Sequence, residues 1–210
     1  ETEVFARKKR TPTVGEICKG LVSGWRVILR CMGMSAMAVV TSQAVTTYAP
    51  TFIKSLNLGD LAGFVTLFFV GLTIMLSLPV FAIVADKVNR RSMLIVVTLT
   101  AVVSAYPMLA WLAASPSVAK FATVEIWFSL LYAAYSAAQV PTMVETVPAE
   151  SRTAGYSFAQ ATAAAILGGF TPAIATWLNH TFASNAMVGL WLAIAAGISL
   201  VAVLTLDGRK

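Results

Sequence analysis

Long stretches without a charged residue alternate with short polar segments along the chain. The charge-free stretches are 31–53, 61–85, 92–119, 126–144 and 153–206. A helix needs about 20 apolar residues to cross the hydrocarbon core of a bilayer. The last stretch is long enough for two such helices, divided at Asn179 and His180. The pattern therefore predicts an all-α, polytopic membrane protein with six transmembrane helices.

The polar segments set the predicted bounds of the elements. We expect the spans at about 28–53, 61–85, 92–115, 124–145, 153–179 and 184–206. Residues 1–27 are polar and basic, which predicts a cytoplasmic linker with a short interfacial helix ahead of a bundle at 28–210. Prolines inside spans should kink or locally unwind them; these are Pro79, Pro107, Pro141 and Pro172. Gly168 and Gly169 beside Pro172 indicate that the fifth span bends most.

Composition and charge agree with this interpretation. Only 11% of the residues are charged, against about 25% in a soluble domain. The net charge of +6 is concentrated at one side of the predicted membrane, where thirteen of the fifteen Lys and Arg residues fall, leaving Lys54 and Lys120 on the other. The positive-inside rule then places both ends in the cytoplasm, in a multi-pass protein of the cell (inner) membrane with no nucleic-acid partner.

Polar side chains form stripes on particular spans. Gln43, Thr46 and Thr47 share a face of the first span, and the fourth span carries Tyr132, Tyr135, Ser136 and Gln139 at i, i+3, i+4 and i+7. We predict that Gln43, Thr47 and these four residues bind the substrate, with helix packing as the alternative. The fifth span has a stripe of small and polar residues typical of close packing: Ser157, Gln160, Ala164, Gly168 and Thr171.

The sixth span differs from the first and the fourth. It carries a single hydroxyl, Ser199, between 188 and 204. An apolar surface of this kind can face lipid nearly all round. We therefore expect this span at the outside of the bundle.

The connection between the second and third spans carries a motif. It reads Ala82-Ile-Val-Ala-Asp86-Lys-Val-Asn89-Arg90-Arg91. This segment resembles the second-half copy of the signature loop of the major facilitator superfamily, G-x-x-x-D-[RK]-x-G-[RK]-[RK]. Ala82 and Asn89 replace the two glycines, and asparagine is the residue that best tolerates a left-handed backbone after glycine. The alternative is that these charges only set the topology.

The connection between the fourth and fifth spans resembles the acid–Pro–Arg–Gly loop of the same superfamily. It runs from Glu145 through Pro148 to Arg152 and Gly155. We predict ion pairs between Asp86 and Arg91 and between Glu145 and Arg152, with Arg90 in the signature loop, as an inner gate. Such pairs at a partly dehydrated edge are worth about 1 kcal/mol each.

Three further segments resemble bacterial metabolite:proton symporters, and among them the citrate–proton symporters most. They are Tyr48–Phe52, Pro141–Arg152 and Phe170–Leu178. The likeness covers essentially the whole chain as helices seven to twelve. It implies symport of citrate or a related carboxylate by alternating access, with a six-helix N-terminal half as partner, no cofactor, and a proton or else sodium as coupling ion. Other small metabolites (a dicarboxylate, a sugar or an osmolyte) and a non-transporting scaffold half remain alternatives.

The sequence also argues against other classes. No Lys or Arg lies deep in a span, so the substrate-binding arginine and the proton carrier are expected in the other half. The single histidine, His180, lies at the outer side and no acids pair within a span. An enzyme active site or a metal site is therefore not expected.

Overall fold

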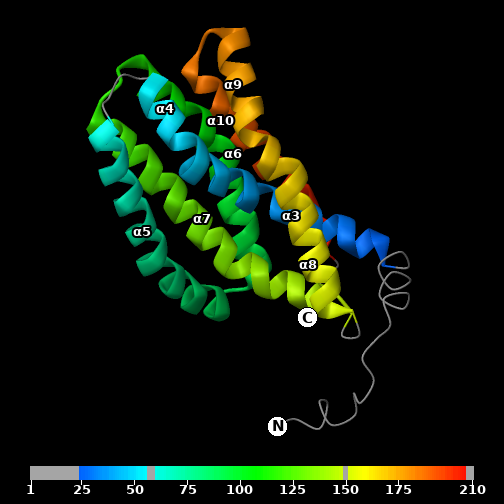
Figure 1. Ribbon diagram of the computed structural model, residues 1–210. Helices are drawn as coiled ribbons and strands as arrows, with labels where there is room; N and C mark the ends of the chain where they lie inside the picture. The colour runs from blue at the N-terminus through cyan, green and yellow to red at the C-terminus, as the bar shows by residue number, and fades with distance from the viewer. Residues whose placement is uncertain (1–23, 56–59, 149–150, 207–210) are drawn as a thin grey trace.

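A computed structural model describes residues 24–55, 60–148 and 151–206, all of them helical rods and their connections (Figure 1). Cys18 and most of the predicted linker lie outside the described residues. Six stretches are long and apolar enough to cross a membrane, which confirms the predicted number of spans. The elements are α3 (Trp25–Gln43), η1 (Ala44–Tyr48), α4 (Ala49–Ser55), α5 (Asp60–Lys87), α6 (Arg90–Ala114), α7 (Val118–Thr146), α8 (Arg152–Ala163), η2 (Ala164–Gly168), α9 (Gly169–Phe182), η3 (Asn185–Met187) and α10 (Val188–Leu204).

Two of the six spans contain a π-helical turn, η1 in the first span and η2 in the fifth. Each ends near a proline, Pro50 or Pro172. A proline lacks the N–H that would bond to the carbonyl four residues earlier and its ring collides with that carbonyl. Those carbonyls belong to Thr46 and Gly168, which lie inside the π turns. The wider turn is how the helix accommodates each proline, and in the fifth span it falls where the sequence predicted a bend.

The helices continue without interruption through the other three prolines that the sequence analysis placed inside spans. Pro79, Pro107 and Pro141 lie inside α5, α6 and α7. Local unwinding is therefore not seen at these positions, and the predicted kinks stay a prediction. Long flanking helices keep their remaining backbone hydrogen bonds there.

The sequence predicted that lipid would surround the last span, and this prediction is wrong. The fully buried Ser199 of α10 accepts a hydrogen bond from the Met37 amide (2.8 Å) and donates one to the Gly33 carbonyl (2.9 Å), both on α3. On the α6 side, a Cβ added at Gly189 would lie 2.6 Å from the Ala105 carbonyl oxygen. A single hydroxyl and a glycine thus position α10 between α3 and α6.

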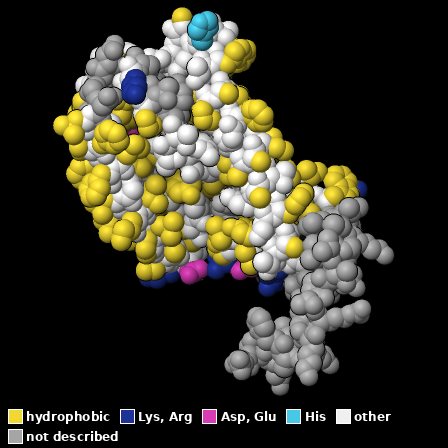
Figure 2. Space-filling view, in the orientation of Figure 1, with side chains coloured by type: hydrophobic (Ala, Val, Ile, Leu, Met, Phe, Trp, Pro, Cys, Tyr) yellow, Lys and Arg dark blue, Asp and Glu magenta, His cyan; other side chains and the backbone are white. Residues whose placement is uncertain are grey.

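The second span, α5, is the least covered. In its most apolar stretch 6% of the residues are buried, against 28% to 61% in the other spans. Hydrophobic side chains cover much of the surface, and charged side chains gather along one end of the rods (Figure 2). α5 packs on α7 alone along most of its length, so its remaining face is free for lipid or another helix bundle.

Candidate functional site

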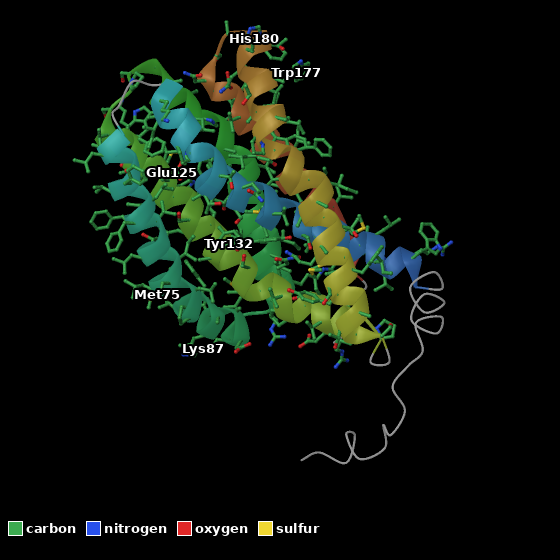
Figure 3. All side chains as sticks on the ribbon, in the orientation of Figure 1. Met75, Lys87, Glu125, Tyr132, Trp177 and His180 are labelled. Atoms are coloured by element: carbon green, nitrogen blue, oxygen red, sulfur yellow. The ribbon has the colours of Figure 1, made fainter. Side chains whose placement is uncertain are left out.

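Four of the six spans line an open cavity of about 570 Å³ that has both polar and apolar side chains in its wall, and this volume is within the range of small-molecule sites. The spans that line it are the first, second, fourth and fifth; α6 and α10 contribute no lining residue. Its polar lining consists of neutral hydrogen-bonding side chains: Ser42, Gln43, Tyr132, Ser136, Gln139, Tyr156 and Gln160. Figure 3 shows Tyr132 about halfway along the bundle.

Four of the six predicted substrate-binding residues meet at this cavity. Gln43 approaches from α3, and Tyr132, Ser136 and Gln139 approach from α7. Thr47 lies one turn beyond Gln43, is exposed, and donates a hydrogen bond to Gln43 Oε1 at 2.6 Å. Thr47 therefore contacts the lining rather than the space itself.

Tyr135 lies elsewhere. Its side chain is fully buried and its hydroxyl donates to the Met34 carbonyl of α3 at 2.6 Å. At about 100° per residue, Tyr135 is turned roughly 60° from Tyr132 around α7, which points it into the contact with α3. In this conformation it joins two helices and does not line the cavity.

Sequence reasoning missed part of the lining. Ser35, which received no role, donates to Gln160 Oε1 at 2.7 Å and accepts from Gln139 Nε2 at 3.2 Å. This contact joins α3, α7 and α8 through side chains alone. Tyr156, Gln160 and Ala164 all line the cavity at i, i+4 and i+8. The stripe on the fifth span, interpreted as packing, was the signal that could have identified two of them.

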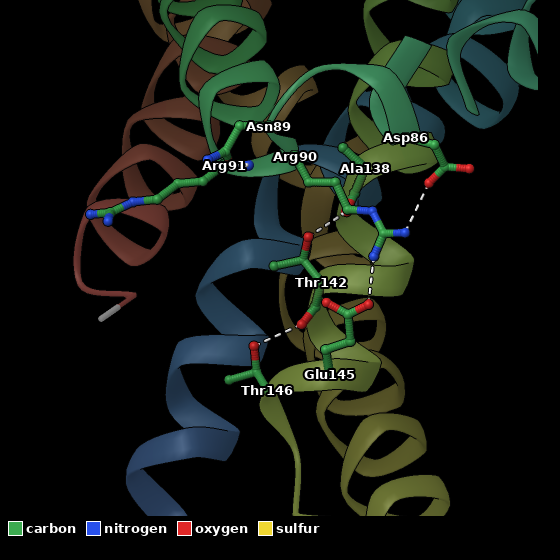
Figure 4. A network of polar contacts seen from close by, with 8 residues as sticks. All are labelled: Asp86, Asn89, Arg90, Arg91, Ala138, Thr142, Glu145 and Thr146. Atoms are coloured by element: carbon green, nitrogen blue, oxygen red, sulfur yellow. Dashed lines mark hydrogen bonds and ion pairs between the residues drawn. The ribbon is translucent and has the colours of Figure 1, made fainter. Parts of the chain in front are cut away.

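A network of charges lies at the end of the bundle where α5 meets α6 (Figure 4). The Arg90 guanidinium donates to Asp86 at 2.8 Å and to Glu145 at 2.5 Å. The predicted pairs Asp86–Arg91 and Glu145–Arg152 are therefore wrong. Successive residues of a helix point about 100° apart, so Arg90 faces α7 while Arg91 reaches the Leu204 carbonyl of α10 at 3.0 Å. Arg152, at the start of α8, is exposed.

Asn89 has a different role from the one predicted. Its φ is −60°, so it does not adopt a left-handed conformation. It is the N-cap of α6, and its Oδ1 accepts a hydrogen bond from the Arg91 amide at 3.0 Å. Asparagine is among the preferred N-cap residues. This cap fixes where α6 begins and hence which arginine faces α7.

Glu125 is a further residue that the sequence analysis missed. The predicted fourth span begins at 124, which leaves Glu125 at the membrane edge. In the structure α7 begins at Val118, after a cap in which Ser117 Oγ accepts from the Lys120 amide at 3.3 Å. Glu125 is thus about two turns inside the helix, and only 6% of its surface is exposed. The sequence analysis therefore assigned no role to an acidic residue that lies buried inside this helix.

The fold and the site together define a class. Four of six membrane-spanning helices line a cavity without charged side chains among its described lining residues, and an ion-pair network joins helix ends at one side of it. This is the organisation of one half of a secondary transporter. The model of the family described as "Sugar (and other) transporter" matches residues 3–206, and the chain belongs to this family of the major facilitator superfamily.

Curated relatives agree with the family. The chain is 34% identical over 203 residues to a citrate-proton symporter of Salmonella typhi, covering 96% of this chain and 47% of the relative. It is 35% identical over 211 residues to a citrate-proton symporter of Klebsiella pneumoniae, covering 100% and 48%. The inner membrane metabolite transport protein YhjE of Escherichia coli (strain K12) is 33% identical over 129 residues, covering 60% and 28%.

The chain therefore spans about half the length of the first two curated relatives that it matches. No solved structure matches it. The family and the relatives are transporters.

Proposed function

We propose that the chain is the C-terminal six-helix half of a symporter that moves citrate or a related carboxylate together with a proton by alternating access, in the cell inner membrane with both ends cytoplasmic. The observation that carries the proposal is the neutral polar cavity beside the Arg90 network. The similarity to two citrate-proton symporters over nearly the whole chain supports the choice of substrate.

The chemistry of the cavity suits the orientation of an anion. Gln43, Gln139 and Tyr132 carry amide and hydroxyl donors that can bond to carboxylate oxygens without bringing a charge into the membrane. No charged side chain is among the described lining residues. A multiply charged substrate needs a cation to offset its desolvation. In this proposal an arginine from the other half supplies that charge.

The Arg90 network is the proposed inner gate. Arg90 connects Asp86 at the end of α5 with Glu145 at the end of α7, and both helices line the cavity. Breaking the two pairs frees those helix ends to separate and opens the cavity on this side. Remaking them closes it again, so the network is broken and formed once per cycle.

The proposed partner half covers the cavity from the side of α5. This helix contributes Leu78 and Ala82 to the lining, although it is the least covered helix of the bundle. A bundle that packs on α5 would close the cavity and bring in the missing cation. A non-transporting scaffold, the alternative, would not need a cavity with these polar side chains in its lining.

A second candidate is the transport of an uncharged metabolite such as a sugar or an osmolyte. The neutral lining favours it as much as it favours an anion that is neutralised elsewhere. The family description also includes sugars.

Proteoliposomes test these alternatives. This chain joined to the six-helix half proposed to precede it is reconstituted, and uptake of radiolabelled citrate is measured with an inward proton gradient or an inward sodium gradient. We expect saturable uptake with the proton gradient, competed by unlabelled tricarboxylate but not by glucose or betaine. Competition by a neutral solute alone would replace the proposed substrate, and uptake with the sodium gradient alone would replace the proton.

A further inference from the structure

A second cavity lies beside Glu125, on the part of α7 nearer to its first residue (Figure 3). Its volume is about 20 Å³, which is room for roughly one water molecule. Among the lining residues that the structure describes, Glu125 is the only acidic one, and the others are apolar: Ala44, Val45, Ala49, Leu109, Phe128, Val188 and Leu192. Within the part of the chain that the structure describes, Glu125 Oε2 is buried and has no hydrogen-bond partner.

The neighbouring charged groups do not neutralise this carboxyl. Lys54 of α4 is exposed and borders a different cavity, and Lys120 of α7 donates to Ser115. The described part of α10 carries no charged residue, and Tyr106 of α6 and His180 of α9 are exposed. Of the other charges on α3, α5, α6, α7 and α8, Asp60 begins α5 and the rest lie at the opposite ends of those helices.

A carboxylate that is buried without a partner is costly, and binding a proton removes that cost. A charged or ionisable residue inside a membrane segment is retained where function needs it. If the surrounding wall opens and water reaches the carboxyl, the ionised form is no longer penalised. The protonation of Glu125 therefore depends on whether the small cavity is sealed or open.

One helical turn links this small cavity to the large one. Gln43 lines the large cavity, whereas the next two residues, Ala44 and Val45 of η1, line the small one. One face of α7 carries Glu125, Phe128 and Tyr132 at i, i+3 and i+7. Seven residues of helix rise about 10 Å, so this is the axial distance between Glu125 and Tyr132. Mid-helix π turns recur at functional sites. A movement of η1 would change both cavities at once.

We infer that Glu125 is a proton-binding site of the transport cycle and that the η1 turn is the wall that seals it. The inference rests on the proposed function and deepens it. The carboxylate takes up one proton from water when its cavity opens to one side, holds it as the neutral acid in the sealed state, and releases it as the carboxylate when the cavity opens to the other. No redox partner is involved.

Infrared spectroscopy of the complete transporter tests proton binding without any substrate. We expect the wild-type protein at neutral pH to show the C=O band of a buried protonated carboxyl that is absent in Glu125→Gln. In Glu125→Asp, which keeps an acid one methylene shorter, the band should shift in frequency and remain. Wild-type and Glu125→Gln spectra without a carboxyl difference would overturn the assignment. The glutamine variant should fold, because it is an isostere of the protonated side chain.

Transport measurements separate a coupling role from a structural one. In the same proteoliposomes, Glu125→Gln should lose accumulation driven by the proton gradient at least tenfold, while exchange of external labelled citrate for internal citrate continues. Glu125→Asp should restore part of the accumulation. Unchanged accumulation in Glu125→Gln would mean that Glu125 is a buried acid with no role in coupling, and would overturn the inference. If the wild type moves no citrate by either assay, the proposed substrate fails, and the infrared result still decides whether Glu125 binds the proton.

Discussion

Arg90 at the first residue of α6 donates to Glu145 near the end of α7 at 2.5 Å, although 55 positions separate the two in sequence. The same guanidinium holds Asp86 at 2.8 Å, four positions earlier. One side chain therefore ties the ends of three helices together. The carboxylate side chains are 67% and 68% exposed, so each pair contributes only about 0.2–1 kcal/mol. Contacts of this size can be exchanged within a transport cycle.

Replacing Arg90 by glutamine should favour the conformation that is open at this end of the bundle. A loss of about 1 kcal/mol changes the ratio of the two conformations roughly fivefold. The measurement is the labelling rate of a cysteine introduced at Ala137, which lines the cavity, in the complete transporter. Arg152→Gln is the matched control, because Arg152 is exposed and Glu145 pairs with Arg90 instead. Equal labelling in both variants would restrict these charges to a topological role.

Two tyrosines on α7 allow the same chemical change to be compared in two environments. Tyr132→Phe removes a hydroxyl from the cavity lining and should raise the half-saturation concentration about tenfold, since one lost donor is worth roughly 1.4 kcal/mol. Tyr135→Phe removes the bond to the Met34 carbonyl. This variant should lower the free energy of unfolding by about 1 kcal/mol and leave the half-saturation concentration unchanged. The reverse pattern would place the substrate against α3 at Tyr135.

Gln43→Leu tests the cavity from the other side. Gln43 lines the space from α3 and also accepts a hydrogen bond from Thr47. The leucine variant should weaken apparent affinity about tenfold at normal expression, through the loss of the amide donor. Thr47→Val, which leaves the Gln43 amide in place, serves as the comparison and should have a smaller effect. Loss of expression in Gln43→Leu with unchanged affinity in the remaining protein would assign the residue to helix packing.

Gly168 sets the distance between the first and fifth spans. A Cβ at this position would lie 2.5 Å from Val39 Cγ1 and 3.3 Å from Gln43 Cγ. Gly168→Ala should therefore separate the two spans and destabilise the protein by about 1–3 kcal/mol. Gly71→Ala on α5 meets no atom within 4 Å, so it should leave the unfolding temperature in detergent unchanged or raise it. Equal behaviour of the two variants would contradict this account of the close approach.

The 210-residue chain by itself should not accumulate substrate. Its described cavity has a neutral lining and α5 is largely uncovered, so an anion entering it would lack a compensating charge. Radiolabelled citrate uptake into proteoliposomes that contain only this chain, with an imposed proton gradient, is the measurement. Saturable uptake driven by the gradient would contradict the prediction, and liposomes without protein give the background.

The sequence by itself determined the number of spans and much of the cavity lining. Span length is a property of a continuous stretch, because each helix satisfies its own backbone inside the membrane. The periodicity of α7 brought Tyr132, Ser136 and Gln139 to one face, since side chains at i, i+4 and i+7 of any helix lie together. The proline at 172 marked the irregular turn of the fifth span for an equally local reason.

Only the tertiary structure decided which neighbour each polar group meets. Arg90 rather than Arg91 pairs with the acids because of the rotation of α6 about its axis, and Ser199 is buried because α3 lies against it. Tyr135 belongs to the same stripe as Tyr132 but lies on the edge that contacts α3. Glu125 is buried because α7 begins earlier than its hydropathy indicated and because α6, α10 and η1 surround it. Helix rotation and inter-helix contacts depend on residues far apart in the chain, and no local pattern records them.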